Sequence, residues 1–337
     1  MSEYLPVNAY FLGRLNRETI INLENDVFVN QPGGNLLYTA YGYKLWQKQA
    51  GLLAKVSEDF PEEWIKEISQ QGFNTKGIKR ISDQVDDRRF YAIRSDEIDI
   101  DNPQKYFYSL GQPFPKNLLG YSSNEVLLDY RKSSSTTTIK PEDVPKDYLN
   151  ARFLFICPLD FISHSLIPAF FRSHSEGEVF FHPSRSYMNT SFFFDFPTLI
   201  RGAAGFFTSE KELLDLYTGK SKDTWEIAEW ISGFSVGLVV ISTKSQGYLL
   251  YDSHHQKRYH IPAYPSKVVD PIGVDDAFYG GFLAGYITHF DPVRAVQMGS
   301  ISASIKIEGS TARYLLGALP DLAQARLSMI KNQIEIC

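Results

Sequence analysis

Strand-like and helix-like segments alternate along most of this chain, and the alternation restricts the folds it can adopt. Short apolar runs such as Phe153–Ile156 and Leu238–Ser242 have the composition of buried strands. Segments with apolar residues at helical spacing, such as Glu62–Gln71 and Trp225–Gly233, lie among them. This order of segments predicts a three-layer α/β domain.

The pattern gives a full set of expected elements. The expected strands are Ala9–Leu12, Gly51–Val56, Phe153–Ile156, Glu178–Phe181, Ala204–Thr208 and Leu238–Ser242, followed by an antiparallel hairpin of Gly247–Tyr251 and Arg258–Ile261. The expected helices are Leu36–Gln49, Glu62–Gln71, Glu210–Tyr217, Trp225–Gly233, Val293–Ile305 and Leu322–Gln333.

Two segments interrupt the alternation. Asn16–Gln31 and roughly 84–108 are rich in β-branched, aromatic and charged residues without helical periodicity. We expect strands there that project from the main sheet as a flap or lid. Lys132–Thr138 is a polar connector, but strand–helix units continue on both of its sides. We therefore expect it to be a long loop within a single domain that spans residues 1–337.

Composition excludes several classes of protein. The 337 residues carry a net charge of −5, and no run of Lys and Arg stands out, which argues against a nucleic-acid binder. Cys157 and Cys337 cannot make a disulfide framework or a metal site between them. No apolar run approaches transmembrane length, and the first residues lack the features of a signal peptide. We expect a cytoplasmic protein that binds neither nucleic acid nor membranes.

The stretch Asp270–Gly281 carries the strongest chemical signal. It follows the apolar run Lys267–Val269, which we expect to be a short strand, and leads into the helix-like segment Ala277–Tyr286. Free backbone N–H groups and the positive end of a helix dipole meet at such a turn and favour anions. An aspartate beside the anion is able to take a proton from an attacking hydroxyl. The stretch therefore indicates phosphoryl transfer.

A second stretch, Gln31–Tyr38, contains two adjacent glycines before a helix pattern. Gly33 and Gly34 allow close approach of the backbone to a ligand, and Asn35 can donate to and accept from a hydroxyl. By itself, Pro-Gly-Gly is more often a simple tight turn.

Taken together, Gly33-Gly34-Asn35 and Asp270-x-x-Gly273-x-x-Asp276 resemble the two signatures of the ribokinase-like carbohydrate kinase family, often called the PfkB family. Further similar blocks lie between and after them, at 51–59, 204–214, 240–250 and 299–309, so the resemblance covers most of the chain. It implies a three-layer ribokinase-like fold with a central, mostly parallel sheet and a small β-strand lid. A dinucleotide oxidoreductase is set aside, because no Gly-x-Gly-x-x-Gly follows the first strand.

The resemblance also implies roles for single residues. Asp276 would be the base, and the backbone N–H groups of Gly273, Val274, Asp275 and Asp276 would form the anion hole. The cofactors would be ATP and Mg²⁺, with Glu212 holding the metal through water. The residues expected near the nucleotide are Ser209, Glu212, Ser242, Lys244 and Gly247, and those expected at the acceptor are Glu18, Gly33, Gly34 and Asn35.

Plainer alternatives exist for three of these residues. Asp276 could be only a residue that starts a helix, Glu212 a solvated surface charge, and Glu18 an ordinary member of a lid strand.

Asp275 is the main departure from the family pattern, which has Gly there. A side chain restricts backbone geometry that Gly tolerates. A second carboxylate about 4 Å from the γ-phosphate would repel it by roughly 4 kcal/mol at an effective dielectric near 20, and it would raise the pKa of Asp276. The other departures are Glu18 for Asp, Tyr38 for Asn, His182 for Asp, Ser209 for Asn, Lys244 for Gly and Pro271 for Thr. The carbonyl of Pro271 stays available, which leaves room for a monovalent cation.

Two functions follow from this pattern. The first is an ATP-dependent kinase for a hydroxyl, with a primary one favoured, of a sugar or nucleoside. The alternative is a weakened or inactive ligand-binding or regulatory relative of such kinases, because Asp275 replaces Gly. Exposed lid strands would suit a homodimer that pairs through the lid.

Overall fold

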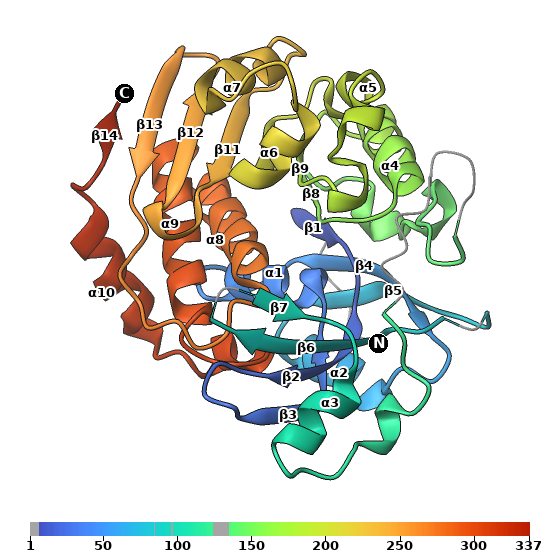
Figure 1. Ribbon diagram of the computed structural model, residues 1–337. Helices are drawn as coiled ribbons and strands as arrows, with labels where there is room; N and C mark the ends of the chain where they lie inside the picture. Colours follow the sequence, from blue (N-terminus) through green and yellow to red (C-terminus); the bar gives the residue numbers. More distant parts are fainter. Residues whose placement is uncertain (1–6, 84, 96, 124–134) are drawn as a thin grey trace.

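The computed structural model describes residues 7–83, 85–95, 97–123 and 135–337. Within these ranges, ten strands form one large sheet in the order β14-β13-β12-β11-β10-β9-β8-β1-β4-β5 (Figure 1). Neighbouring strands from β11 to β5 are parallel, whereas β12, β13 and β14 extend one edge in the antiparallel direction. The strands are β1 Ala9–Leu12, β4 Gly51–Ser57, β5 Asn74–Ile81, β8 Phe153–Ile156, β9 Glu178–Phe181, β10 Gly205–Ser209, β11 Leu238–Ser242, β12 Tyr248–Asp252, β13 Lys257–Ile261 and β14 Glu335–Ile336.

Helices cover both faces of this sheet, because successive strand residues point to opposite sides. In β1, Phe11 joins one apolar cluster while Tyr10 and Leu12 join the other. The first cluster includes α1 Asn35–Lys44, α2 Glu62–Gln70, α8 Val274–His289, α9 Pro292–Lys306 and α10 Pro320–Ile330, and the second includes α4 Phe161–His174, α5 Phe196–Ile200, α6 Glu210–Leu216 and α7 Thr224–Ser232. None of the helices in the described ranges is both long enough and apolar enough to cross a bilayer.

Short 3₁₀ helices connect several of these elements. They are η1 Lys116–Leu118, η2 Pro141–Asp143, η3 Lys146–Tyr148, η4 Arg185–Tyr187, η5 Thr190–Phe192, η6 Lys244–Gln246 and η7 Ala312–Gly317. The expected three-layer α/β architecture is confirmed.

Four strands of the described ranges form a second sheet, in the order β3-β2-β6-β7, which we call the small sheet. Its strands are β2 Asn16–Ile21, β3 Val27–Gly33, β6 Arg88–Arg94 and β7 Glu97–Asp99, and Figure 1 shows them beside the beginning of α8. Ile21, Phe90 and Ala92 pack on one face against α3, Pro103–Ser109. The opposite face of the small sheet is not covered by α3. The end of the expected lid range 84–108 is helical, because Pro103 begins α3.

Other expectations differ from the structure, and the expected helix Leu322–Gln333 is observed as Pro320–Ile330. Lys267–Val269 is not a strand, because the amides of Val269 and Asp270 both donate to the carbonyl of Ile307, at 2.9 and 3.1 Å, and not to a neighbouring strand. The first helix ends at Lys44 rather than Gln49, and the chain then turns toward β4. Residues 132–134 of the expected connector Lys132–Thr138 lie outside the described residues, and residues 135–138 form a turn in which the amide of Thr138 donates to the carbonyl of Ser135 at 3.0 Å.

Candidate active site

The Asp270–Gly281 motif lies at the carboxyl ends of the parallel strands. Ser209 ends β10 and Ser242 ends β11, and the two residues are paired in register. The Oγ of Ser242 donates to Oδ1 of Asp275, in the first turn of α8, at 3.2 Å. Ligands of α/β proteins bind at this end of a parallel sheet. The fold therefore brings the motif to the edge where an anion is expected.

Gly273 forms the turn that starts α8. Its φ of 74° is in the left-handed region, and a Cβ there would lie 2.2 Å from the ring of Tyr38. The amide of Val274 donates to the carbonyl of Pro271 at 3.3 Å, so it belongs to the turn. The next amides, of Asp275 and Asp276, are among the first in the helix and have no acceptor within it. These two groups are the better anion donors.

Asp276 is half-buried in the first turn of α8. Burial raises the pKa of its carboxyl to about 7, and the charges of Asp275 and Glu212 add to the rise, while His182 opposes it. A carboxylate with a pKa near neutrality is a stronger base than an ordinary aspartate and is still substantially ionised. The geometry is therefore suitable for proton abstraction next to the free amides of the helix.

Asp275 sits in a regular helical turn, so its side chain imposes no positive-φ strain. Its surface is exposed to solvent, and Ser242 is its hydrogen-bond donor. Loss of hydration beside the surrounding protein atoms raises the pKa of its carboxyl, and the charge of Glu212 adds to the rise. His182 and the hydrogen bond from Ser242 lower the pKa. The backbone difficulty expected for a non-glycine residue here is thus absent, and the electrostatic one remains.

Glu212 is held by a capping box at the start of α6. Its Oε2 accepts from the amide and the Oγ of Ser209, at 3.0 and 2.9 Å, and the amide of Glu212 donates back to that Oγ at 3.3 Å. Burial would raise the pKa of Glu212, but His182 and Ser209 outweigh burial and hold the pKa at about 2. Glu212 is therefore a mostly buried, fixed carboxylate and not a solvated surface charge.

His182 is a site residue whose role sequence reasoning missed. It follows β9, and its Nε2 lies 3.6 Å from Oε2 of Glu212. Its ring packs against that of Tyr279, with centroids 4.7 Å apart, and its Nδ1 has no hydrogen-bond partner among the described residues. The sequence feature that could have identified it is His182 itself, which stands before Pro183 where the family pattern has Asp.

Two expected nucleotide residues are placed less specifically. Lys244 has φ 56° in η6, and its side chain is exposed. Gly247 has φ 104°, and a Cβ would lie 2.2 Å from the carbonyl of Ile261. The close contact between β12 and β13 is thus a sufficient reason for glycine at 247, whether or not a phosphate binds nearby.

The two glycines of the early motif pack against Glu18. The Oε1 of Glu18 accepts from the amide of Gly34 at 2.7 Å, and its Oε2 accepts from the hydroxyl of Tyr38 at 2.8 Å. A Cβ on Gly33 would lie 2.0 Å from Oε2 of Glu18. Burial raises the pKa of Glu18 to about 7. Contact between Glu18 and an acceptor stays a prediction: each carboxylate oxygen can accept a further hydrogen bond, but the side chain is buried.

Asn35 is likewise engaged by the backbone. Its Oδ1 accepts from the amide of Arg14 at 2.7 Å, and its Nδ2 donates to the carbonyl of Pro158 at 2.8 Å. These bonds fix the start of α1 relative to the end of β8. Each end of the amide has further hydrogen-bonding capacity, so acceptor binding by Asn35 also stays a prediction.

The small sheet contributes a residue that the sequence did not single out. In its register Glu18 lies opposite Arg89, and Ile20 lies opposite Tyr91. Arg89 and Tyr91 alternate along β6 with Phe90, which packs against α3. Their side chains therefore lie on the face of the small sheet opposite α3. Burial raises the pKa of the Tyr91 hydroxyl, and the charges of Glu18 and Asp276 contribute, which places Tyr91 in the electrostatic environment of the candidate base.

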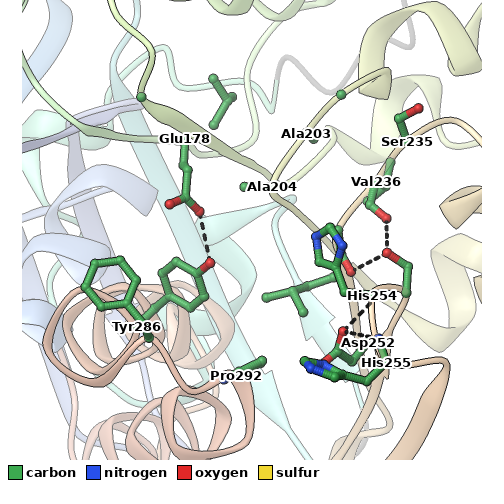
Figure 2. Close-up of a pocket in the computed structure, with 17 residues that line it drawn as sticks. Glu178, Ala203, Ala204, Ser235, Val236, Asp252, His254, His255, Tyr286 and Pro292 are labelled. Carbon is green, nitrogen blue, oxygen red and sulfur yellow. Dashed lines mark hydrogen bonds and ion pairs between the residues drawn. The ribbon is translucent and has the colours of Figure 1, made fainter.

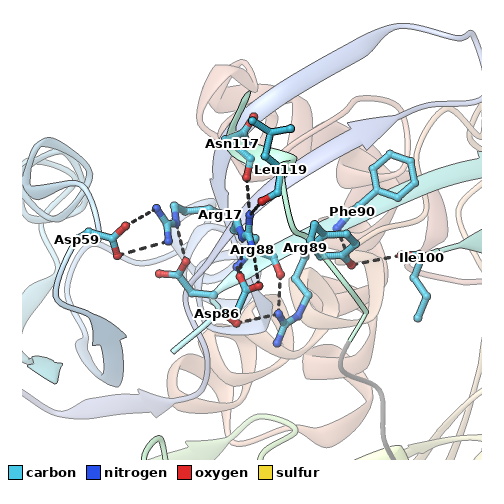
Figure 3. A network of polar contacts seen from close by, with 11 residues as sticks. Arg17, Asp59, Asp86, Arg88, Arg89, Phe90, Ile100, Asn117 and Leu119 are labelled. Carbon is cyan, nitrogen blue, oxygen red and sulfur yellow. Dashed lines mark hydrogen bonds and ion pairs between the residues drawn. The ribbon is translucent and has the colours of Figure 1, made fainter. Parts of the chain in front are cut away.

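A polar network joins the small sheet to the main sheet (Figure 3). Arg17 of β2 contacts Oδ2 of Asp59 at 3.0 Å and Oδ1 of Asp87 at 2.5 Å. Asp87 also accepts from the Oγ of Ser57, at the end of β4, at 2.7 Å. In the same figure Arg88 binds Asp86 and two main-chain carbonyls. The network fixes the small sheet over the carboxyl end of β4.

A cavity of about 590 Å³ lies elsewhere, at the amino ends of the parallel strands (Figure 2). Glu178 begins β9 there, and its carboxylate accepts from the hydroxyl of Tyr286 at 2.9 Å. Asp252 ends β12, and its Oδ2 lies 2.7 Å from Nδ1 of His255. Because this cavity is at the opposite end of the strands from Asp276, its size does not identify the reaction site.

The groups that could hold a nucleotide and a metal ion lie at the carboxyl ends of the parallel strands. In the described residues no group of three or more His, Cys, Asp and Glu side chains is arranged to hold a metal ion. Mg²⁺ in phosphoryl-transfer sites keeps several waters and is bound by one or two carboxylates plus phosphate oxygens. The fixed Glu212 and the free amides of α8 are compatible with that mode of binding.

Comparison with known proteins gives consistent results. Residues 174–317 match the model of the pfkB family carbohydrate kinases. A cytidine kinase of Thermococcus kodakarensis is 25% identical over 282 residues, which cover 82% of this chain and 87% of that protein. The adenosine kinase of Sinorhizobium meliloti superposes with a TM-score of 0.70 at 17% identity, covering 96% of this chain and 99% of that one.

Another similar structure is the aminoimidazole riboside kinase of Salmonella enterica, complexed with aminoimidazole riboside and an ATP analogue. It has a TM-score of 0.67 at 16% identity and covers 95% of this chain and 100% of that chain. The matched range 174–317 contains Glu212, Ser242 and Asp276. The chain therefore has the ribokinase-like fold, and its residues 174–317 are similar to the pfkB family of carbohydrate kinases.

Proposed function

We propose that the protein is an ATP- and Mg²⁺-dependent kinase that phosphorylates a hydroxyl, with a primary one favoured, of a sugar or nucleoside. One observation carries the proposal: Asp276, with a pKa raised to about 7, stands in the first turn of α8 beside amides that have no partner in the helix. The names of the similar kinases, which act on cytidine, adenosine and aminoimidazole riboside, support this class of acceptor.

The proposed reaction is a single displacement. The acceptor oxygen forms a bond to the γ-phosphorus of ATP while the bond from that phosphorus to the β–γ bridging oxygen breaks, and ADP leaves with the electron pair. Asp276 takes the hydroxyl proton. The amides of Asp275 and Asp276 donate to the γ-phosphoryl oxygens as charge moves onto the leaving group. Mg²⁺, held through water by Glu212, would neutralise phosphate charge.

The small sheet supplies the acceptor side of this proposal. Its face with Arg89 and Tyr91 is opposite the face covered by α3, and would exclude water from the acceptor as a lid does. The edge strands β3 and β7 expose Val29 and Ile98, so pairing of two copies through a lid edge belongs to the same proposal. Light scattering coupled to size-exclusion chromatography tests the pairing: a mass of one chain excludes it.

One observation favours the alternative, a binding or regulatory protein without turnover. The exposed carboxylate of Asp275 is next to the proposed phosphate position, where a negative charge opposes ATP binding. Such a protein would bind a sugar or nucleoside and release no ADP in response to it.

An acceptor screen separates the two. ADP formation is measured with Mg²⁺ and ATP over a panel of sugars and nucleosides, and the phosphorylated product is identified by mass spectrometry. The kinase proposal expects ADP and phosphorylated acceptor in equal amounts. Asp321→Asn is the matched control for the loss of a first-turn aspartate in Asp276→Asn. Asp321 is an exposed aspartate in the first turn of α10, so its replacement should leave the rate of ADP formation unchanged. Binding of a panel member without ADP formation, by wild type and by Asp275→Gly, would establish the alternative.

A further inference from the structure

Lys306 is a fully buried lysine directly beneath the turn that precedes α8. Both Lys306 and Asp270 have side chains that are 0% exposed, and Lys306 Nζ lies 3.5 Å from Oδ2 of Asp270. The same Nζ donates to the main-chain carbonyl of Asp270 at 3.2 Å and to that of Gly309 at 2.8 Å. Lys306 therefore links the end of α9 to Asp270, the first residue of the Asp270–Gly281 motif.

The contacts identify the group as an ammonium ion. A protonated lysine has three donors and no acceptor, and three oxygens lie around Nζ. The centroid of the Tyr38 ring is 5.4 Å away, a favourable distance for a cation over an aromatic face. Lys306 is also the last residue of α9, where the helix dipole favours a positive charge. Burial lowers the pKa of Lys306, and the charges of Asp270 and Glu18 oppose that effect.

Asp270 connects the ammonium group of Lys306 to the backbone of the turn before α8. Its Oδ1 accepts from the amide of Ile272 at 2.8 Å, and Oδ2 has the ion-pair contact with Lys306 but no hydrogen bond among the described residues. Gly273, the N-cap of α8, follows one residue after Ile272. A cation held by Asp270 thus fixes the backbone that presents the amides of Asp275 and Asp276.

We propose that the ammonium of Lys306 acts as a built-in monovalent cation that positions the Asp270–Asp276 turn, so that the protein needs no K⁺ or Na⁺ at this place. Two carbonyl oxygens and a carboxylate are the oxygen ligands that hard cations take, and here a tethered ammonium occupies the point where they converge. The expected effect on turnover rests on the proposed kinase function. The cation chemistry does not, and it can be tested without an acceptor.

The first test compares salts. The Tm of the wild-type chain is measured in KCl, NH₄Cl, NaCl and choline chloride at equal ionic strength, and it should be the same in all four. In choline, Lys306→Ala should melt roughly 5 °C or more below wild type, because its removal leaves Asp270 as an unpaired buried charge. K⁺ or NH₄⁺ should recover about 2 °C or more of that loss, since an ion that binds only the folded state stabilises it by mass action.

Lys55→Ala is the matched control. Lys55 Nζ also donates to a main-chain carbonyl, that of Thr138 at 2.8 Å, and pairs with Asp143 at 2.8 Å, away from the phosphate motif. This variant should lose stability equally in all four salts. Once an acceptor has been identified, the turnover of Lys306→Ala should rise by about tenfold or more when choline is replaced by K⁺ or NH₄⁺. The turnover of wild type should be the same in all of these salts.

Two results would overturn the proposal. One is a K⁺-specific rise in the Tm of wild type, or displacement of bound Tl⁺ by K⁺ in wild type, and this measurement stands even if Lys306→Ala does not fold. The other is a folded Lys306→Ala whose Tm is the same in every salt, which would make Lys306 a structural tether only. If wild type forms no ADP with any acceptor, the kinase function fails, but the Tm and Tl⁺ measurements still decide the role of Lys306.

Discussion

The imidazole Nε2 of His182 lies 3.6 Å from Oε2 of Glu212, and this contact puts a group that can carry positive charge among the acidic residues of the site. The charge of His182 lowers the pKa of Glu212, Asp275 and Asp276. The chain differs from the pfkB pattern that it resembles at both His182 and Asp275, with a basic residue at one position and an additional acid at the other. We infer that the two departures compensate each other.

This relationship gives the first prediction, a double-mutant cycle. His182→Gln should lower kcat/KM for ATP by about tenfold to a hundredfold, because it removes the imidazole that opposes the rise in the pKa of Asp275. In an Asp275→Gly background the same change should have a smaller effect, since one acidic partner is gone. Steady-state kinetics on the four proteins measure the coupling. An equal loss in both backgrounds would show that the two residues act independently.

The second prediction concerns pH. Burial raises the pKa of Asp276 to about 7, and the proposed base must be ionised, so kcat/KM should fall about tenfold per pH unit below that value. Asp275→Gly should move this limb to lower pH, because the charge of Asp275 contributes to the rise. The control is Glu18→Gln: Glu18 also has a pKa of about 7, and the limb should persist without it. A limb that disappears in Glu18→Gln would assign the titration to Glu18.

The third prediction is a pH dependence of stability from Glu18. Burial raises its pKa from 4.5 to about 7 in the folded protein, so the folded state holds the proton more tightly than the unfolded state. This contribution is fully present below about pH 4.5 and is lost as the pH rises through about 7. Across that window it amounts to roughly 3 kcal/mol.

Glu18→Gln should remove that dependence, because a glutamine can keep a bond to Gly34 and one to Tyr38 without titrating. The difference in unfolding free energy between variant and wild type should shift in favour of the variant between pH 4.5 and 7.5, as measured by urea denaturation. Asp276 titrates in both proteins and cancels in the difference. A difference that is flat with pH would mean that Glu18 is ionised throughout.

The fourth prediction concerns the attachment of the small sheet. Arg17→Met should destabilise the protein by about 3 kcal/mol, because the Asp87 side chain is only 3% exposed and would lose its charged partner. Asp59→Asn should change stability by less than about 1 kcal/mol, since the Asp59 side chain is 70% exposed. Chemical denaturation compares the two variants. Equal losses would contradict the view that the buried half of the network fixes the small sheet.

Local pattern was enough to predict much of the fold. β8, β9 and β11 have the predicted bounds, because an apolar run between polar turns specifies a buried strand with little help from the rest of the chain. Lys267–Val269 has a similar composition but is not a strand, because its partner is the carbonyl of Ile307 beyond α9. β5 was also not anticipated, since it contains three charged residues and no apolar run, and only Asn74 and Gly77 of the strand are buried.

The site was predictable as a set of positions but not as a set of partners. The spacing of Gly273 and Asp276 identified the start of α8, because a helix start is a local feature. The bonds from Gly34 and Tyr38 to Glu18 depend on how the small sheet packs on α1, and the contact of His182 with Glu212 depends on two adjacent strands. Lys306 looks like an ordinary helix-ending lysine in the sequence, and only the fold shows that it is buried.

The most direct test of the account is a single-turnover measurement of phosphoryl transfer by wild type and Asp276→Asn, with the acceptor found in the screen. The account predicts that the variant still binds ATP but transfers the γ-phosphoryl group about 10²- to 10⁴-fold more slowly, because the isosteric amide cannot take the proton. Transfer by Asp276→Asn at the wild-type rate would contradict the assignment of Asp276 as the base.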